Sequence, residues 1–340
     1  MTAKIEPNYD KEREILKNVI PLSSPYTVLI EITRLCNFKC FYCAHSIETT
    51  KKTECNTMKI EEFKIISKQI CQFSPHPKRI LFVGLGEPLI NRALPEMIRT
   101  LRTDGFTGKI DVVTNGSLFT QDYTKQLISS GVSKFIISLQ GLTSDSYIDN
   151  CKYSLDYDKF IENLTYLYKN KKDTHIYIKI IDSMLKSKQE EQIFYSTFSP
   201  ICDSCYIEHL ICNQEKMGDH GGIVDNSRNV FNEYVTPREI CAMPFYQMQI
   251  FLDGSVLACP ITDISMELSI GNIHNNTLLE IWNGRERINL LKKMLKHKVT
   301  SFNSCRKCES KDFIVDAREN LDDSYATILE RMDKYYDFTD

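Results

Sequence analysis

The sequence has no excess of charge of either sign and no long hydrophobic run. Its 42 Lys and Arg residues nearly balance 45 Asp and Glu residues, giving a formal net charge of −3. This balance excludes a basic surface field for nucleic acid and an acidic tail. No apolar run approaches the roughly 18–20 residues that span a bilayer, and the first residues are too polar for a secretory signal. We therefore expect a cytoplasmic protein with no nucleic-acid or membrane partner.

Cysteine, in contrast, is abundant. The chain has 13 cysteines, an odd number, although the sequence predicts no export to an oxidising compartment. Clustered cysteines in the cytosol more often bind metal or carry out redox chemistry than form disulfides. They fall into three groups and a remainder, at positions 36, 40 and 43; 241, 259, 305 and 308; 202, 205 and 212; and 55, 71 and 151.

Short β-rich runs alternate with helical patterns in the first two thirds of the chain. The expected strands are 26–33, 79–83, 109–114, 134–140, 175–182 and 205–212, and the expected helices lie near 58–73, 94–104, 121–130, 157–169 and 188–198. Such alternation predicts βαβ units around a parallel sheet. A complete barrel of eight units needs about 250 residues. The pattern stops earlier, so we predict an α/β fold with a partial (β/α)6 barrel.

The alternation within the strands predicts which face lines the site. Ile176, Ile178 and Ile180 are apolar, whereas Tyr177 and Lys179 point the other way. The apolar set should pack under the helices. The polar set should face inward near the carboxyl ends of the strands, where such sheets place their sites.

A second, smaller module is expected after the barrel. Residues 245–252 and 255–259 form a predicted hairpin around the turn Asp253-Gly254. A helix is predicted near 277–295, with Asn276 as a possible N-cap. The chain then divides into a lead-in (1–25), a partial barrel (26–240), an α+β module (241–310) and a tail (311–340).

Three cysteines at the end of the first expected strand form a strong motif. Cys36, Cys40 and Cys43 have the spacing C-x3-C-x2-C, with Tyr42 just before the last. A [4Fe–4S] cluster usually takes four thiolates, so three leave one iron open to a chelating ligand. A structural zinc site with His45 as a fourth ligand is the alternative.

This motif resembles that of the radical S-adenosylmethionine (SAM) enzymes, and the resemblance continues along the chain. Leu85-Gly86-Glu87-Pro88 resembles the family's Gly-Gly-Glu-Pro motif, with Leu85 in place of the first glycine. The resemblance implies cofactor-binding roles for Tyr42, Gly86, Glu87, Pro88, Asn115, Ser138, Gln140 and Lys179. Ser138 and Lys179 have a simpler interpretation as solvated strand ends.

The resemblance also implies the chemistry. In this family SAM chelates the open iron, and an electron from the cluster cleaves it to a 5′-deoxyadenosyl radical, which abstracts hydrogen from a substrate. An electron donor such as flavodoxin or ferredoxin is then an expected partner. The protein itself positions the reactants and excludes water.

Cys241, Cys259, Cys305 and Cys308 are enough for one closed cluster. This segment resembles the SPASM/twitch extensions of radical SAM enzymes. No cysteine follows Cys308, so the resemblance implies a single auxiliary [4Fe–4S] cluster. Rubredoxin-like iron or zinc is the alternative.

The remaining candidates lie near the last expected strand. Cys202 and Cys205 are interpreted as buried thiols, and Cys55, Cys71 and Cys151 as structural. Glu208 should point inward and is a candidate base, whereas His209 should lie on the packing face. Cys212 is a candidate hydrogen-atom donor.

The compact extension is similar to that of aminocyclitol dehydrogenases of the butirosin-pathway type. This similarity favours oxidation of a hydroxyl on an amino sugar, cyclitol or nucleotide sugar, with the auxiliary cluster as electron acceptor. Epimerisation with a cysteine donor and modification of a ribosomal peptide are alternatives. Outside enzymes, a metal-stabilised structural protein or an electron carrier is the remaining alternative.

Overall fold

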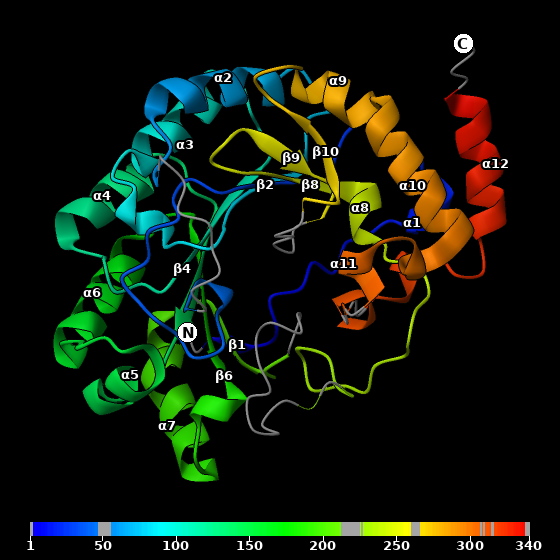
Figure 1. Cartoon of the computed structure of the whole chain (residues 1–340). Helices are drawn as coiled ribbons and strands as arrows, with labels where there is room; N and C mark the ends of the chain where they lie inside the picture. The colour runs from blue at the N-terminus through cyan, green and yellow to red at the C-terminus, as the bar shows by residue number, and fades with distance from the viewer. Residues whose placement is uncertain are drawn as a thin grey trace.

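A ten-stranded sheet forms the centre of the protein, and an arc of helices covers its outer side (Figure 1). The computed structural model describes residues 3–46, 56–211, 225, 227–259, 266–306, 308, 310–313 and 316–336. The strand order is β1-β7-β6-β5-β4-β3-β2-β8-β9-β10. Within those ranges, no helix combines the length and apolarity needed to cross a bilayer.

The six predicted parallel strands are present and confirm the partial barrel. They are β2 Thr27–Ile30, β3 Arg79–Phe82, β4 Lys109–Thr114, β5 Lys134–Leu139, β6 His175–Ile181 and β7 Ser204–Glu208. The five predicted helices are also present, as α2 Ile60–Ile70, α3 Leu94–Thr103, α4 Gln121–Ser129, α6 Tyr157–Asn170 and α7 Lys188–Phe198. Because all six strands run the same way, their carboxyl ends meet at one edge of the barrel.

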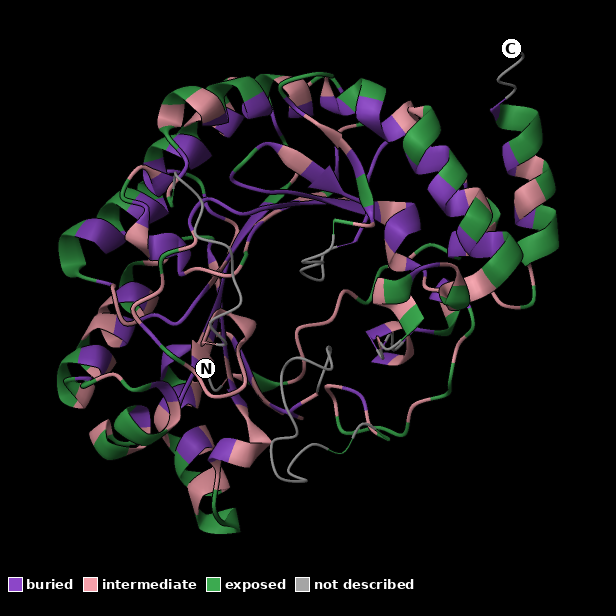
Figure 2. Ribbon diagram, viewed as in Figure 1, coloured by how far each residue is buried: buried purple, intermediate pink, exposed green. Residues whose placement is uncertain are grey.

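Hydrophobic periodicity explains how the helices attach. On α2, Phe63, Ile66 and Ile70 are fully buried against the sheet, as residues three or four apart on one helix face should be. On β6, Ile176, Ile178 and Ile180 belong to the same core. Figure 2 shows the result, with buried strands inside and helices that expose only their outer faces.

The sheet does not end where the barrel was expected to end. The short strand β1 (Lys4–Ile5) pairs with β7, and β8 (Gln247–Ile250) pairs in parallel with β2. The strands β9 (Ser255–Leu257) and β10 (Ser269–Asn272) continue the sheet in antiparallel fashion. The lead-in and the second module therefore extend the same sheet, although the boundary after residue 240 stays a prediction.

The second module differs from its prediction in two places. The helix expected over 277–295 is two helices, α9 (Leu278–Asn283) and α10 (Arg285–His297), because the chain turns at Gly284. The N-cap is Thr277 rather than Asn276: the hydroxyl of Thr277 accepts from the backbone of Glu280, whose carboxylate accepts in return. This reciprocal capping box is the stronger N-terminal signal.

Further helices complete the chain. Helix α5 (Ser144–Cys151) was not predicted, although its cap Thr143 makes a capping box with Ser146. The others are α1 Leu16–Val19, α8 Met243–Tyr246, α11 Asn303–Arg306 and α12 Tyr325–Tyr335. Helix α12 lies along the outside of α10 (Figure 1).

The lead-in covers the amino ends of the barrel strands. Asp10 pairs with Arg79, the first residue of β3, and Arg79 Nε lies 3.0 Å from Asp111 Oδ2. Asn8 Oδ1 accepts from Lys134 Nζ at 2.9 Å. These charged contacts close the amino end, so a substrate site belongs at the opposite, carboxyl edge.

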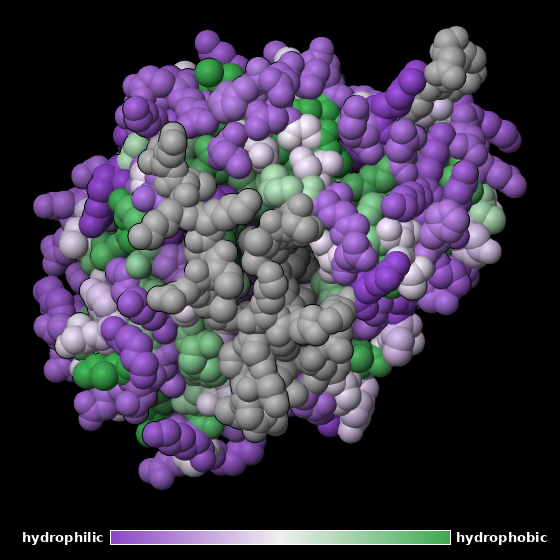
Figure 3. All heavy atoms as spheres, in the orientation of Figure 1, coloured by the Kyte–Doolittle hydropathy of each residue, from purple (hydrophilic) through white to green (hydrophobic). Residues whose placement is uncertain are grey.

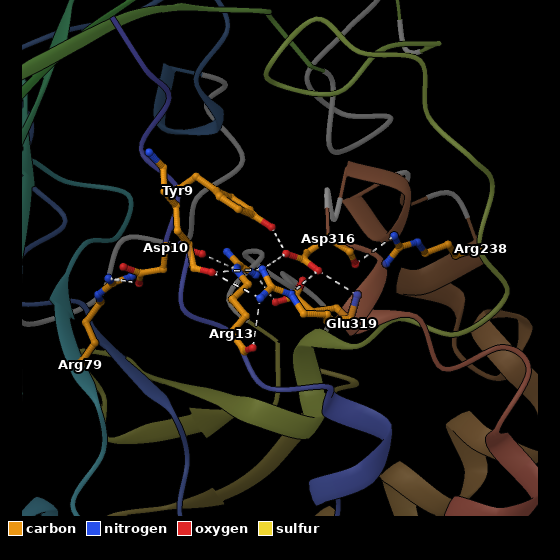
Figure 4. Close-up of polar contacts among 9 residues, drawn as sticks. Tyr9, Asp10, Arg13, Arg79, Arg238, Asp316 and Glu319 are labelled. Carbon is orange, nitrogen blue, oxygen red and sulfur yellow. Dashed lines mark hydrogen bonds and ion pairs between the residues drawn. The ribbon is translucent and has the colours of Figure 1, made fainter. Parts of the chain in front are cut away.

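Side chains of the lead-in also contact side chains of the tail. The Tyr9 hydroxyl donates to Asp316, and Arg13 pairs with Glu319 (Figure 4). Both carboxylates are largely buried. Residues 9–13 of the lead-in and residues 316–319 of the tail are thus fixed to each other.

On the face shown in Figure 3, the described residues form no large apolar patch. Hydrophobic side chains appear only as small, separate areas among hydrophilic ones (Figure 3). The exposed large side chains Ile5, Ile65, Ile193 and Tyr234 come from different elements. Scattered apolar residues of this kind are ordinary on protein surfaces.

We expect Trp282→Ala to destabilise the protein by about 3–5 kcal/mol, because it empties a large, fully buried site. Trp282 is 0% exposed, and its Nε1 donates to Leu22 O at 2.9 Å. The matched control is Leu279→Ala on the same helix, where the side chain is 36% exposed. Urea unfolding measures both variants, and equal losses would contradict this account.

Candidate active site

The loop that follows β2 carries the first three cysteines. Cys36, Cys40 and Cys43 are all partly buried there. The backbone of the loop is anchored on two sides: Glu87 N donates to Leu35 O at 2.8 Å, and Lys39 N donates to Cys151 O at 2.8 Å. The motif is therefore held in place by the chain itself.

The electrostatics of this loop suit a metal cluster. Burial raises the pKa of Cys36 to about 12, and Cys40 and Cys43 add to the rise as neighbouring thiols. Iron bound to the sulfurs offsets that cost, because metal ligation deprotonates thiols. Over the described part of the chain, no three His, Cys, Asp or Glu side chains converge to hold one metal ion. The donor set fits a [4Fe–4S] cluster, in which each thiolate binds a different iron.

Gly86 brings the second motif against the cluster loop. A Cβ atom at this position would lie 2.3 Å from Thr33 O and 2.6 Å from Leu35 O. Only glycine permits so close an approach. The preceding Leu85 donates its N–H to the buried carboxylate of Glu31 at 3.2 Å, so the departure from the family motif does not disturb the turn. Pro88 begins the short 3-10 helix Pro88–Ile90.

Both oxygens of the Glu87 carboxylate accept hydrogen bonds from other groups of the protein. Its Oε1 accepts from Leu89 N at 3.0 Å and Thr114 Oγ1 at 2.6 Å, and its Oε2 accepts from Asn115 N at 2.7 Å. Burial raises the pKa of Glu87 to about 6. Glu87 thus joins the motif to the end of β4, and the Asn115 amide donates onward to Asn37 in the cluster loop at 3.0 Å.

Gln140 connects the cluster loop to β5. Its Oε1 accepts from the Tyr42 hydroxyl at 3.1 Å, and its Nε2 donates to Ser138 O at 3.3 Å. Gln140 is 2% exposed, so its buried side chain fixes the position of Tyr42 in the cluster loop. Ser138 is half-buried and lies in register with Lys179 on β6.

Glu208 and Lys179 form an ion pair on the inward face. Lys179 Nζ lies 2.6 Å from Glu208 Oε2, and the Tyr177 hydroxyl donates to Glu208 Oε1 at 3.1 Å. Burial and the adjacent carboxylate raise the pKa of Tyr177, so it remains a donor. Lys179, which the resemblance assigns to the cofactor, thus has a partner within the chain. Tyr177 was missed as a site residue, although it shares a strand face with Lys179.

The remaining candidate residues near β7 have different surroundings. His209 Nδ1 contacts Asp182 Oδ2 at 2.6 Å, which fits the predicted structural role. Cys202 and Cys205 are fully buried and contact each other through their thiols, as predicted for core residues. Cys212, like Cys55, lies outside the described residues.

Two thiols of the second set, Cys241 and Cys259, lie near Tyr246. Cys241 and Cys259 both contribute electrostatically at its hydroxyl, as do Glu319 and Arg13. Burial raises the pKa of Cys241 to about 12, and Cys308 adds to the rise. Cys305 lies one helical turn before Cys308, with Cys308 N donating to Cys305 O at 3.2 Å. Four thiols from three segments fit a closed cluster.

Known proteins resemble this chain over both halves. Residues 30–185 match the radical SAM superfamily model, and residues 241–309 match the SPASM model, an iron–sulfur cluster-binding domain. The probable GTP 3′,8-cyclase of Metallosphaera sedula is 32% identical over 120 residues, which are 35% of this chain and 36% of that protein. The chain therefore matches about a third of the length of this relative. The S-adenosyl-L-methionine-dependent 2-deoxy-scyllo-inosamine dehydrogenase of Niallia circulans is 21% identical over 83% of this chain and 91% of its own length.

Two solved structures share the fold. BtrN in complex with AdoMet and 2-DOIA has a TM-score of 0.54 at 19% identity, over 83% of this chain and 92% of that chain. Streptococcus suis SuiB bound to S-adenosylmethionine has a TM-score of 0.58 at 15% identity, over 91% and 79%. The family matches, the partial parallel barrel and the two sets of cysteines together show that the chain belongs to the radical SAM enzymes with a SPASM-type extension, which use SAM and iron–sulfur clusters.

Proposed function

We propose that this enzyme oxidises a hydroxyl group of a small polar substrate, an amino sugar, cyclitol or nucleotide sugar, to a ketone. The observation that carries the proposal is the paired Glu208 and Lys179 on the inward face of the barrel. Glu208 is 8% exposed at the carboxyl end of β7. It lies on the same strand edge as the cofactor motifs.

Each residue then has a distinct role. When bound, SAM and the clusters supply hydrogen abstraction at the carbinol carbon and accept the second electron. Glu208 takes the hydroxyl proton as general base. Lys179 holds one oxygen of the carboxylate through a charge-assisted contact, and Tyr177 fixes its orientation from the opposite oxygen. The physiological electron donor is a flavodoxin or ferredoxin, and the location is the cytoplasm.

The dehydrogenase from Niallia circulans supports this choice, because its similarity extends over most of both chains. The cyclase similarity covers only 35% of this chain. Peptide modification is the second candidate, since SuiB, also solved bound to its precursor peptide, shares the fold over 91% of this chain. Epimerisation would require a hydrogen donor, for which Cys212 is the candidate.

We expect Glu208→Gln to abolish ketone formation while 5′-deoxyadenosine continues to form, because only the proton acceptor is lost. The assay uses anaerobically reconstituted enzyme, dithionite and a panel that starts with 2-deoxy-scyllo-inosamine deuterated at the carbinol carbon. Mass spectrometry follows loss of two hydrogens from the substrate and deuterium in 5′-deoxyadenosine. The matched control is Glu162→Gln on the solvent side of α6, where the side chain is 66% exposed.

The outcomes of this assay distinguish hydroxyl oxidation, epimerisation and peptide modification. Ketone formation by Glu208→Gln at the wild-type rate would contradict the role of Glu208 as base. With unlabelled substrate in D2O, a product one mass unit heavier that carries solvent deuterium at the carbinol carbon would indicate epimerisation instead. Turnover of peptides but of no polyol in the panel would overturn the small-substrate proposal.

A further inference from the structure

Strand β8 lies between the two strands that lead into the cysteine motifs. On one side it pairs with β2, which continues into the loop with Cys36, and on the other it pairs with β9, which ends two residues before Cys259 (Figure 1). In the proposed oxidation the substrate loses hydrogen at the first motif and an electron to the second. The inward face of β8 therefore lies beside the position that this substrate occupies.

The alternation of side chains along β8 places Gln249 on the inward face. Met248 and Ile250 are fully buried and belong to the core beneath the helices, so the residue between them points into the barrel. Gln249 is 2% exposed. Its neighbours in register are Leu29 on β2 and Leu257 on β9. The side chains of these two leucines carry no hydrogen-bond donor.

The side-chain carbonyl of Gln249 is an unusual buried group. Its Oε1 accepts a hydrogen bond from none of the residues that the structure describes. Most buried amide oxygens are paired, because an unpaired one loses its hydration without compensation. Asn91, at 3% exposed, shows the usual arrangement. Its amide nitrogen donates to two carbonyls and its Oδ1 accepts from a backbone N–H, those of Ile32, Met58 and Ala93, at 3.0–3.1 Å.

We propose that Gln249 binds the substrate by accepting a hydrogen bond from a hydroxyl or amino group remote from the carbon that is oxidised. This inference rests on the proposed oxidation, which places a polar substrate between the two clusters. An amino sugar or cyclitol carries several such donors, and one bond to a buried acceptor orients its ring. Because the contact is the same in the ground state and the transition state, it contributes to substrate binding rather than to the chemical step.

The test compares the wild-type holoenzyme with Gln249→Met, which keeps the volume of the side chain but removes the acceptor. For the substrate found with the panel above, we expect KM to rise about tenfold, as for the loss of one hydrogen bond, with kcat within about twofold. Without substrate, the midpoint of urea unfolding should be unchanged or higher, because no partner within the chain is lost. Asn91→Leu, which removes a fully paired buried amide, is the matched comparison and should lower this midpoint.

Two results would overturn the proposal. One is a midpoint for Gln249→Met as low as that of Asn91→Leu, which would show that the amide has a structural role. The other is an unchanged KM. Failure of the wild type to oxidise any polyol would instead contradict the proposed function. In that case KM is compared for the peptide that is turned over, and the unfolding midpoints still test Gln249 without any substrate.

Discussion

Cys36→Ala is expected to reduce 5′-deoxyadenosine formation from SAM to the level of a protein-free control. Cys36 is one of the three thiols of the C-x3-C-x2-C motif, and each thiolate of a cluster binds its own iron. Loss of the Cys36 thiolate leaves the motif with two cluster ligands in place of three. Iron should fall from about eight to about four per chain if one auxiliary cluster remains. Anaerobic reconstitution, iron and sulfide analysis and chromatography of the nucleoside products measure both quantities.

A cysteine outside both ligand sets provides the control for Cys36→Ala. Cys71→Ala removes a cysteine at the end of α2 that is only partly buried and belongs to neither set. It should retain full iron and full SAM cleavage. If Cys36→Ala still cleaves SAM at the wild-type rate, the ligand assignment is wrong. If zinc replaces iron in the wild-type protein, the catalytic role of the loop is wrong.

Cys305→Ala should separate SAM cleavage from substrate oxidation. The variant keeps the loop with Cys36, Cys40 and Cys43, so abortive 5′-deoxyadenosine formation continues. It lacks one thiol of the second set, so the electron released by the substrate no longer has the auxiliary cluster as its acceptor. We expect ketone formation to fall to background, measured beside 5′-deoxyadenosine in the same reaction.

The outcome bears directly on the auxiliary cluster. Normal ketone formation by Cys305→Ala would show that the second cluster takes no part in the oxidation. Loss of both activities would indicate that the module is needed for folding, which circular dichroism and iron content distinguish. Ser304→Ala is the matched control, because it alters the same short helix α11 without removing a thiol.

Much of the barrel could be predicted because its signals are local. The alternation in 175–182 assigned Lys179 to the inward face, and the structure places it opposite Ser138 in register. The helix boundaries agree within a few residues for the same reason. Glu208 was expected to point inward, and its contact with Lys179 follows from the common face of neighbouring strands.

Contacts between distant segments could not be predicted in this way. The residue pair Thr27 and Gln247 is adjacent in the sheet but separated by most of the chain, and no periodicity encodes such a pairing. The hydrogen bond from Lys39 N in the cluster loop to Cys151 O depends on how an unpredicted helix docks. The carboxylate of Glu87 was expected to face the cofactor. Its three internal hydrogen bonds depend on where Thr114 and Asn115 end a neighbouring strand.

The pairing of β2 with β8 also affects how the chain can be made. β2 is synthesised early, yet one of its hydrogen-bonding sides stays open until residues 247–250 emerge. An exposed strand edge is a template for pairing with other chains, and the long delay favours misassembly during synthesis. A fragment ending at residue 240 would keep that edge permanently. In the complete fold, β8 of the SPASM-type module covers this edge of β2, so the module closes the barrel sheet on that side in addition to carrying its cysteines.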